Sequence, residues 1–277
     1  MDSTPISFEF FPPRTDAGKE NLQNTWRLLN VADPEFFSVT FGAGGTTQDG
    51  TFETVKAITA DIGVEAAPHL SCIGSTRENI ATLLAQYREA GVKRIVALRG
   101  DLPSGMMSAG EFRYASELVE FIRQEHADHF KIEVAAYPEM HPQAESPDVD
   151  LENFVRKVQA GADAAMTQYF YNSDSYFDFC DRVEQLGVNI PVVPGIMPIT
   201  TYTQLARFSD ACGAEIPRWI RQRLKSYEHD PQSLRAFGAD VVTELCLDLI
   251  SGGAPALHFY TLNKAENVLQ ILNNLEG

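Results

Sequence analysis

The sequence predicts an α/β protein, a single (β/α)8 TIM barrel with extra helices before the last strand, and three observations support this fold. Eight short apolar runs rich in β-branched and aromatic residues each precede a stretch with helical periodicity. Several runs are nearly continuous, as is typical of parallel strands covered on both faces. The chain has 277 residues, and a barrel of this kind takes about 250. We therefore expect one domain over residues 1–277.

The expected elements alternate along the chain. The strands are expected at 6–11, 36–41, 66–72, 94–98, 131–137, 164–170, 191–196 and 256–262. The helices are expected at 16–30, 48–62, 76–90, 112–125, 150–160, 174–186, 201–211 and 264–275. The segment 217–251 interrupts this alternation before the last strand, so we expect it to form additional helices on the barrel wall.

Start and stop signals mark several of these helices. Ser75-Thr76, Asp150 and Asn263 precede helical stretches, and their side-chain oxygens can accept hydrogen bonds from a first helical turn. Glycines favour the left-handed backbone that ends many helices. They follow four of the expected helices, at Gly63, Gly91, Gly161 and Gly187.

Composition excludes several classes of protein. The chain carries 22 Lys and Arg against 38 Asp and Glu, a net charge of −16, so it lacks the basic surface that nucleic-acid binding needs. The sequence shows neither a secretory signal nor an apolar run of about 18 residues, so we expect neither export nor a membrane span. The four cysteines form no C-x-x-C pair, which favours a reducing compartment. We expect a cytoplasmic protein that binds neither nucleic acid nor membrane.

Polar residues, prolines and glycines gather where the expected strands end. In this fold, chemistry takes place at the C-terminal ends of the strands and in the loops that follow them. The sequence places there Glu9, Thr40, His69, Arg99-Gly100-Asp101, Tyr137, His141, Gln168, Tyr260 and Lys264. The active site is therefore expected at this end of the barrel.

Glu9 is the candidate general acid. It lies in the aromatic run Ser7-Phe8-Glu9-Phe10-Phe11, and the alternation of a strand places it on the same face as Ser7. Apolar surroundings raise the pKa of a carboxylic acid toward the range that a general acid needs. The alternative is a structural ion pair.

The other signals each have a structural alternative. Asp101 either displays a carboxylate at the barrel mouth or caps a helix. Asp150 and Lys157 lie seven residues apart on one helix. They either bind a ribose and a phosphate of a ligand or belong to a helix face that is exposed to solvent. His69 is expected to be a hydrogen-bonded histidine, because no H-E-x-x-H or cysteine pair predicts a metal. The glycine-rich turn 42–45 is not a Rossmann fingerprint, because Thr47 stands where the third glycine belongs.

Taken together, the strand-end segments resemble the flavin-dependent methylenetetrahydrofolate reductases, specifically the bacterial type that consists of the catalytic barrel. The resemblance runs from about residue 6 to residue 275. It rests on eight segments in order: FEFFPP from Phe8, SVTFGA from Ser38, APHLSC from Ala67, ALRGDLP from Ala97, AAYPE from Ala135, TQYF from Thr167, PGIMP from Pro194 and HFYTLN from His258.

This resemblance implies an enzyme that reduces 5,10-methylenetetrahydrofolate to 5-methyltetrahydrofolate with NADH or NADPH. FAD would accept the hydride and pass it on in a ping-pong cycle. Glu9 would act as the general acid that opens the folate ring, and Asp101 would lie near both flavin and pterin. Gln168, Gln204, Phe208 and Lys264 would contact substrates. The family also implies a homo-oligomer and, for a barrel without a regulatory domain, no inhibition by S-adenosylmethionine.

The family's FAD contacts can be carried over by position. They fall on Thr40, Ala43, His69, Arg99, Gly100, Asp101, Tyr114, Ala115, Tyr137, His141, Ala144, Asp150, Asn153 and Lys157. Lys157 and His141 would face the pyrophosphate and Asp150 a ribose. The chain departs from many relatives at Lys264, where they have Arg, at Gln143, where they have Glu, and at 47–50, where they have arginines. These departures bear on cofactor and substrate affinity rather than on the chemistry.

Two alternative functions remain open from the sequence. One is a flavin oxidoreductase on the same barrel that uses another acceptor or a partner protein. The other is a flavin- or folate-binding module without turnover. The presence of Glu9, Asp101 and Gln168 together disfavours the module, because binding alone does not need an acid in an aromatic strand.

Overall fold

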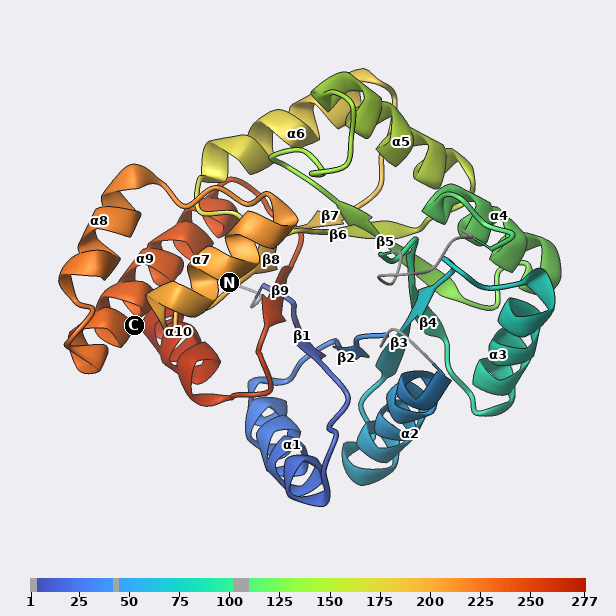
Figure 1. The fold of residues 1–277 in the computed structure, drawn as a ribbon, viewed down its shortest axis with the longest axis horizontal. Coiled ribbons are helices and arrows are strands. Elements are labelled where there is room, and N and C mark those ends of the chain that lie inside the picture. The colour runs from blue at the N-terminus through green and yellow to red at the C-terminus, as the bar shows by residue number, and fades with distance from the viewer. Residues whose placement is uncertain (1–3, 42–44, 102–109) are drawn as a thin grey trace.

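The computed structural model describes residues 4–41, 45–101 and 110–277, with backbone only for residues 45–49. Its strands surround a central axis and its helices lie outside them (Figure 1). Every strand pair in the sheet is parallel. The fold class expected from the sequence, a (β/α)8 barrel, is therefore confirmed. The single-domain expectation stays a prediction.

The described strands form one sheet in the order β7-β6-β5-β4-β3-β2-β1-β9-β8. Their bounds are β1 Ile6–Phe10, β2 Phe36–Val39, β3 Ala66–Ser71, β4 Arg94–Leu98, β5 Lys131–Ala136, β6 Ala164–Thr167, β7 Val192–Val193, β8 Gly195–Ile196 and β9 Leu257–Tyr260. The single strand expected at 191–196 is thus split at Pro194. Proline has no N–H to donate, and the two halves pair with different neighbours, β7 with β6 and β8 with β9.

The helices follow the expected order. They are α1 Asp16–Leu29, α2 Gly45–Ile62, α3 Arg77–Glu89, α4 Ala115–His126, α5 Pro147–Gln159, α6 Ser173–Gln185, α7 Tyr202–Cys212, α8 Arg218–Ser226, α9 Pro231–Ser251 and α10 Glu266–Glu276, with a short 3-10 helix at Asn30–Ala32. The extra helices predicted for 217–251 are α8 and α9. Within the described ranges, no helix is long and apolar enough to cross a membrane.

Some of the predicted helix starts and ends are confirmed and others are wrong. Thr76 accepts a hydrogen bond from the Asn79 N–H at 3.2 Å as the α3 cap, and the four predicted glycines all have positive φ. The prediction for Asp150 was wrong, because α5 begins earlier, at Pro147, behind the Ser146 cap. Proline fits a first helical turn, where its missing N–H has no partner to lose.

Asn263 does not cap α10 either. That helix begins at Glu266, and Asn263 itself has φ +56°. Its side chain instead accepts from the Phe11 N–H at 3.0 Å and donates to the Phe11 carbonyl oxygen at 2.9 Å. The amide therefore ties the end of β1 to the loop after β9, beside the mouth of the barrel.

Strand alternation divides the side chains of β1 and its neighbours between two environments. Phe8 and Phe10 point outward, where both rings contact Phe37 at 5.7 and 5.3 Å between centroids and join the cluster that buries Trp26 of α1. Inside the barrel, Phe36, Ala67, Val96 and Met166 form a separate apolar cluster. Polar side chains share this interior, which leads to the site.

An ion-pair network, which we call the Arg94 cluster, lies at the N-terminal end of the barrel. The Arg94 guanidinium, on β4, bonds Glu133 at 2.7 Å, Glu35 at 3.1 Å and Glu65 at 3.2 Å. It also lies 4.0 Å from the centroid of the Phe36 ring.

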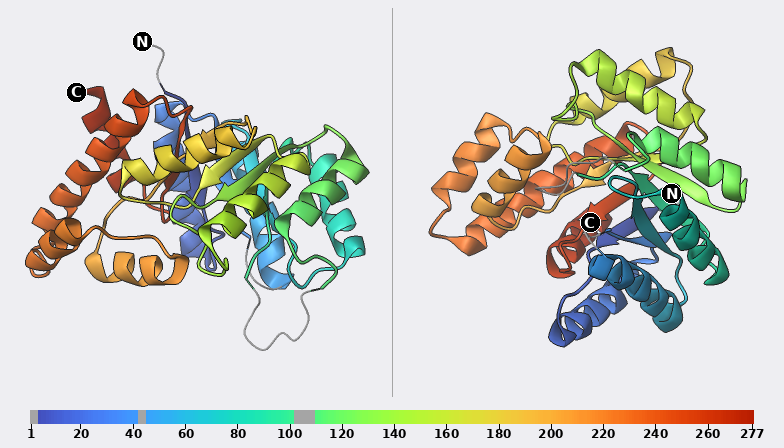
Figure 2. Two further views of the ribbon diagram at one scale, coloured as in Figure 1. Left: turned by 90° about the horizontal axis from the view of Figure 1, so that it is seen from above. Right: turned by 45° about the vertical axis from the view of Figure 1, so that its right-hand side comes forward.

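The left panel of Figure 2 shows the two ends of the barrel from the side. The C-terminus lies at one end of the barrel and α7 lies at the opposite end.

Candidate functional site

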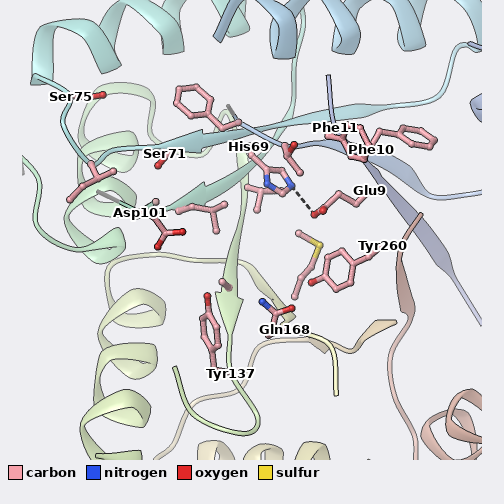
Figure 3. A pocket seen from close by; sticks show the side chains of 18 of the residues that line it. Glu9, Phe10, Phe11, His69, Ser71, Ser75, Asp101, Tyr137, Gln168 and Tyr260 are labelled. Carbon is pink, nitrogen blue, oxygen red and sulfur yellow. Dashed lines mark ion pairs between the residues drawn. The ribbon is translucent and has the colours of Figure 1, made fainter. Parts of the chain in front are cut away.

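A cavity of about 780 Å³ occupies the C-terminal end of the barrel, and we call it the central cavity. Its walls come from strand ends on every side of the barrel, including Glu9, Thr40, His69, Asp101, Gln168 and Tyr260. Figure 3 shows Glu9 and His69 facing each other on one side of this cavity, with Asp101 on the other side. The predicted location of the site coincides with this cavity, and the roles of its residues stay predictions.

A second cavity of about 430 Å³, the side cavity, lies between α5 and the start of α4. The two cavities share the wall residues Leu98, Gly100, Asp101, Ala135 and Tyr137. They therefore adjoin and together form an elongated space that runs from the barrel axis to the outer helices.

Glu9 lies between two histidines. Its Oε2 is 3.4 Å from Nε2 of His69 on β3 and 3.9 Å from Nε2 of His258 on β9. Burial lowers the pKa of His69, so that ring is neutral at pH 7. No lysine or arginine of the described chain lies within ion-pair distance of Glu9, whose side chain is 19% exposed. The structural ion pair considered for Glu9 therefore has no lysine or arginine partner in the described chain, and the Glu9 side chain lines the central cavity.

The backbone conformation and the close neighbours at position 100 both require a glycine. It has φ +82°, and a Cβ at this position would collide with Oγ of Ser71. That hydroxyl is itself fixed, because it donates to the Arg99 carbonyl oxygen at 2.9 Å. A bound group can therefore approach the Gly100 backbone from either cavity.

Asp101 is exposed and lines both cavities. It does not cap the following helix, because α4 begins at Ala115 and the Glu117 carboxylate accepts from the backbone N–H groups of Arg113 and Tyr114. Asp101 instead stands where the central cavity meets the side cavity.

The residues matched to FAD come together. The side cavity is lined by Arg99, Gly100, Asp101, Tyr114, Ala115, Tyr137, His141, Ala144, Asp150, Asn153 and Lys157. Thr40 and His69 line the central cavity. Ala43 and most of the turn 42–45 lie outside the described residues. Gln143, a departure from the family pattern, lines the side cavity, where its side chain bonds the Arg99 guanidinium.

The side cavity ends in a partly buried cation. The Lys157 ammonium contacts the Ala135 carbonyl oxygen, and desolvation lowers its pKa to about 8, opposed by the charge of Asp150. The Asp150 carboxylate accepts from the His141 backbone N–H at 2.8 Å. Burial and the nearby Arg99 charge lower the pKa of His141. Lys157 thus does not lie on a solvated helix face, and an anion in this cavity would stabilise its charge.

The residues expected to contact substrates are not all brought together. Gln168 lines the central cavity, where its Oε1 accepts from the Tyr169 N–H at 3.0 Å. Gln204 and Phe208 lie on α7, and Lys264 is exposed before α10. These three line neither cavity.

The sequence patterns did not predict two hydrogen bonds in the barrel interior, which involve Ser7, His258 and Tyr260. Ser7 Oγ lies 2.7 Å from His258 Nδ1, and the Tyr260 hydroxyl donates to the Thr167 carbonyl oxygen at 2.6 Å. The signal was present, because alternation places Ser7 on the face of Glu9 and His258 on the face of Tyr260.

Comparison with known proteins gives a consistent result. A family model described as methylenetetrahydrofolate reductase matches residues 1–276. The 5,10-methylenetetrahydrofolate reductases of Escherichia coli and Salmonella typhimurium are 42% and 41% identical to this chain over 270 residues, covering 98% of it and 90% of each relative. The methylenetetrahydrofolate reductase (NADH) 1 of Arabidopsis thaliana is 38% identical over 285 residues, covering 98% of this chain and 48% of the relative.

A solved structure shares the fold. It is a protein from Clostridium thermocellum that binds two copies of 5-methyl-5,6,7,8-tetrahydrofolic acid. Its TM-score is 0.70 and the alignment covers 99% of this chain and 94% of that protein, with 17% sequence identity. At this identity the likeness concerns the fold alone.

Proposed function

This chain belongs to the methylenetetrahydrofolate reductase family, and from that premise we propose that it reduces 5,10-methylenetetrahydrofolate to 5-methyltetrahydrofolate with NADH or NADPH. One observation carries the proposal furthest. The family's acid, Glu9, faces a cavity that adjoins the space lined by the residues matched to a flavin. The whole reaction therefore has room at one end of one barrel.

We propose FAD as the flavin. When bound, it supplies hydride transfer from the nicotinamide to the folate. The donor set suits a dinucleotide: Lys157, His141 and Arg99 offer positive charge or hydrogen bonds to a pyrophosphate, and Asp150 and Asn153 offer hydrogen bonds to a ribose. Gly100, where no side chain fits, lets a planar ring system approach the backbone between the two cavities.

Glu9 would supply the proton that the folate step consumes. Reduction of the methylene group adds one hydride to the carbon and one proton to the ring nitrogen whose C–N bond breaks. The Glu9 carboxyl group donates that proton and becomes a carboxylate. A positioned general acid contributes about 100- to 10,000-fold to a rate.

The remaining side chains would bind and orient the substrates. Asp101 offers a carboxylate to the amino-pyrimidine edge of the pterin, and Gln168 offers an amide on the adjacent wall of the central cavity. We propose that Phe208 stacks on substrate or nicotinamide, that Gln204 contacts the same group and that Lys264 binds the glutamate end of the folate. Because these three lie outside the cavity wall, they would meet the parts of a substrate that extend beyond it. The homo-oligomer and the cytoplasmic location stay predictions.

The deciding experiment is an absorbance spectrum of the purified protein under anaerobic conditions. The flavin band between 350 and 500 nm should bleach when NADH or NADPH is added and return when methylenetetrahydrofolate follows. Bleaching without return would indicate a flavin oxidoreductase with another acceptor. A flavin band that neither nucleotide bleaches would indicate a binding module, and a protein that takes up no FAD would overturn the cofactor.

A further inference from the structure

A short turn after β9 fastens the end of β1 at the mouth of the barrel. The parallel ladder between the two strands ends at the pair Glu9 and Tyr260, and side chains bond the residues that follow. The Thr261 hydroxyl donates to the Glu9 carbonyl oxygen at 2.7 Å. The Asn263 amide accepts from the Phe11 N–H at 3.0 Å and donates to the Phe11 carbonyl oxygen at 2.9 Å. Both backbone polar groups of Phe11 are therefore bonded beyond the end of the ladder.

The chain after Phe11 cannot provide this anchoring itself. Pro12 and Pro13 follow, and a proline has no N–H to donate to a neighbouring strand. Pro12 also restricts the backbone of Phe11 to extended conformations. The Asn263 side chain thus takes the place of a strand partner at the last residue before the prolines.

The turn that carries Asn263 has an unusual backbone. Leu262 and Asn263 are consecutive residues with positive φ, +53° and +56°, a conformation that is unfavourable for residues other than glycine. Such strain persists only where the surrounding structure imposes it, and it is concentrated at functional sites. Here the Asn263 N–H donates to Thr261 Oγ1 at 3.1 Å, and the Thr25 hydroxyl donates to the Asn263 carbonyl oxygen at 3.3 Å. These contacts hold the Asn263 amide against Phe11.

Phe11 is the aromatic residue of this segment that meets the cavity. Strand alternation places it on the same face as Glu9, about 7 Å further along the chain. Its side chain lines the central cavity (Figure 3) and is 47% exposed, whereas Phe8 and Phe10 are fully buried. Ligand pockets are lined mainly by apolar and aromatic side chains. The exposed Phe11 ring therefore offers a flat apolar surface to a bound molecule.

The order of groups in the folate matches the order of residues on this side of the cavity. In the proposed step, Glu9 protonates the ring nitrogen whose C–N bond breaks, and that nitrogen carries the benzoyl group of the folate. The glutamate is attached to the other end of the benzoyl group. Lys264, which we propose binds that glutamate, directly follows Asn263. Phe11 lies two residues from the acid and is bonded to the neighbour of this lysine, so its ring stands where the benzoyl group would pass.

We propose that the Phe11 ring packs against the benzoyl ring of the folate and that Asn263 is the positioning residue that fixes Phe11 for this contact. The inference rests on the proposed function, which makes the folate the substrate. A well-placed pair of aromatic rings contributes about two- to tenfold to an affinity beyond the area it buries. NADH has no counterpart of the benzoyl group next to its reacting ring, so this contact serves the folate alone.

The test separates the Asn263 amide from the backbone that carries it. Asn263→Gly removes both bonds to Phe11 and leaves a residue that adopts the left-handed backbone without strain. Asn263→Ala removes the same bonds and adds strain. Phe11→Ala removes the ring, and the double variant Phe11→Ala/Asn263→Gly removes both. Asp33→Gly is the matched control, because Asp33 also has a positive φ, +50°, but precedes β2 at the opposite end of the barrel.

The measurement is stopped-flow absorbance of the FAD-loaded protein, with reoxidation followed over a range of methylenetetrahydrofolate concentrations. Phe11→Ala should raise the folate concentration for half-maximal reoxidation about tenfold, and each Asn263 variant should raise it about three- to tenfold. The limiting rate should change less, because Glu9 is retained, and reduction by NADH should proceed at the wild-type rate. The double variant should be no weaker than Phe11→Ala, because Asn263 acts through the ring. Asp33→Gly should match wild type.

Four results would overturn the inference. The first is wild-type half-saturation in both Asn263 variants. The second is a double variant whose loss is the product of the two single losses, which would give Asn263 a role apart from Phe11. A loss in Asn263→Ala but not in Asn263→Gly would assign the effect to the backbone, and an equal weakening of the NADH step would make Phe11 a wall shared by both substrates. If Asn263→Ala does not fold, Asn263→Gly and the double variant decide. Failure of the folate to reoxidise the wild-type protein would instead refute the proposed function, and this inference with it.

Discussion

The two ends of the barrel differ in how completely their buried ionisable groups are paired. At the N-terminal end, Arg94 is bonded to three carboxylates at 2.7 to 3.2 Å. At the C-terminal end, Glu9 faces histidines at 3.4 and 3.9 Å, and Lys157 has a pKa lowered to about 8 by desolvation. Ionisable groups that are paired inside the protein stabilise its fold, whereas ionisable groups left without full partners are available to a ligand. The difference supports the proposal that one end of the barrel mainly stabilises the fold and the other end carries the chemistry.

The largest expected effect tests the chemical end. Glu9→Gln keeps the size of the side chain and removes its acidic proton, so reoxidation by methylenetetrahydrofolate should fall by about 100- to 10,000-fold. Reduction by NADH, which needs no acid from the protein, should be unchanged. Stopped-flow absorbance of the two half-reactions measures both rates. Equal losses in both would remove Glu9 from the acid role.

The next effect tests the structural end. Arg94→Ala leaves the carboxylate of Glu133, which is 3% exposed, buried without its main partner, and breaking such a buried pair costs about 3–5 kcal/mol. We expect a loss of this size in the free energy of unfolding measured in urea, with the activity per bound FAD preserved in the protein that remains folded. Lys131→Ala is the control, because Lys131 is 44% exposed and its contacts with the same carboxylates are 3.8 to 4.0 Å long. It should cost less than about 1 kcal/mol. A variant at Arg94 that lost activity without losing stability would contradict the division between the ends.

Sequence patterns predicted the barrel and most of its elements because alternation and helical periodicity are local properties. Local patterns failed where tertiary contacts decide, as at Pro194, which splits a strand, and at Asn263, which binds Phe11 rather than a helix. The site was predicted in the same way. The position of Glu9 follows from its own strand, whereas its contact with His258 joins residues that are far apart in the chain and meet only when the barrel closes. The placement of Gln204 and Phe208 outside the cavity wall likewise depends on how α7 packs.

A glycine at each end provides a finer comparison. Gly100 and Gly63 both have positive φ, +82° and +72°, but only at Gly100 would a Cβ meet another atom, Oγ of Ser71. Gly63→Ala should therefore cost only the backbone strain, about 1–2 kcal/mol. Gly100→Ala should cost more in the urea measurement. It should also weaken FAD binding at least tenfold by fluorescence titration, because the added methyl group displaces the wall that both cavities share. Equal stability costs and equal FAD affinities would mean that the close approach at Gly100 does not matter for the ligand.

The smallest effect concerns Lys157 and pH. In the unbound protein its pKa is lowered to about 8, so the ammonium is charged below pH 8 and increasingly neutral above it. Binding of an anionic pyrophosphate favours the charged form and raises this pKa, so FAD binding takes up a proton in the range between the two values. The dissociation constant for FAD should therefore be level below about pH 7.5 and should rise above pH 8, by at most about tenfold per pH unit. Titrations of FAD fluorescence from pH 6.5 to 9.5 measure this curve. Lys157→Met should bind FAD more weakly at neutral pH, and its dissociation constant should no longer rise above pH 8. Lys131→Met, a change at the opposite end of the barrel, should keep the wild-type affinity and the wild-type pH dependence. A wild-type curve that stayed level through pH 9 would mean that the charge of Lys157 plays no part in holding the cofactor.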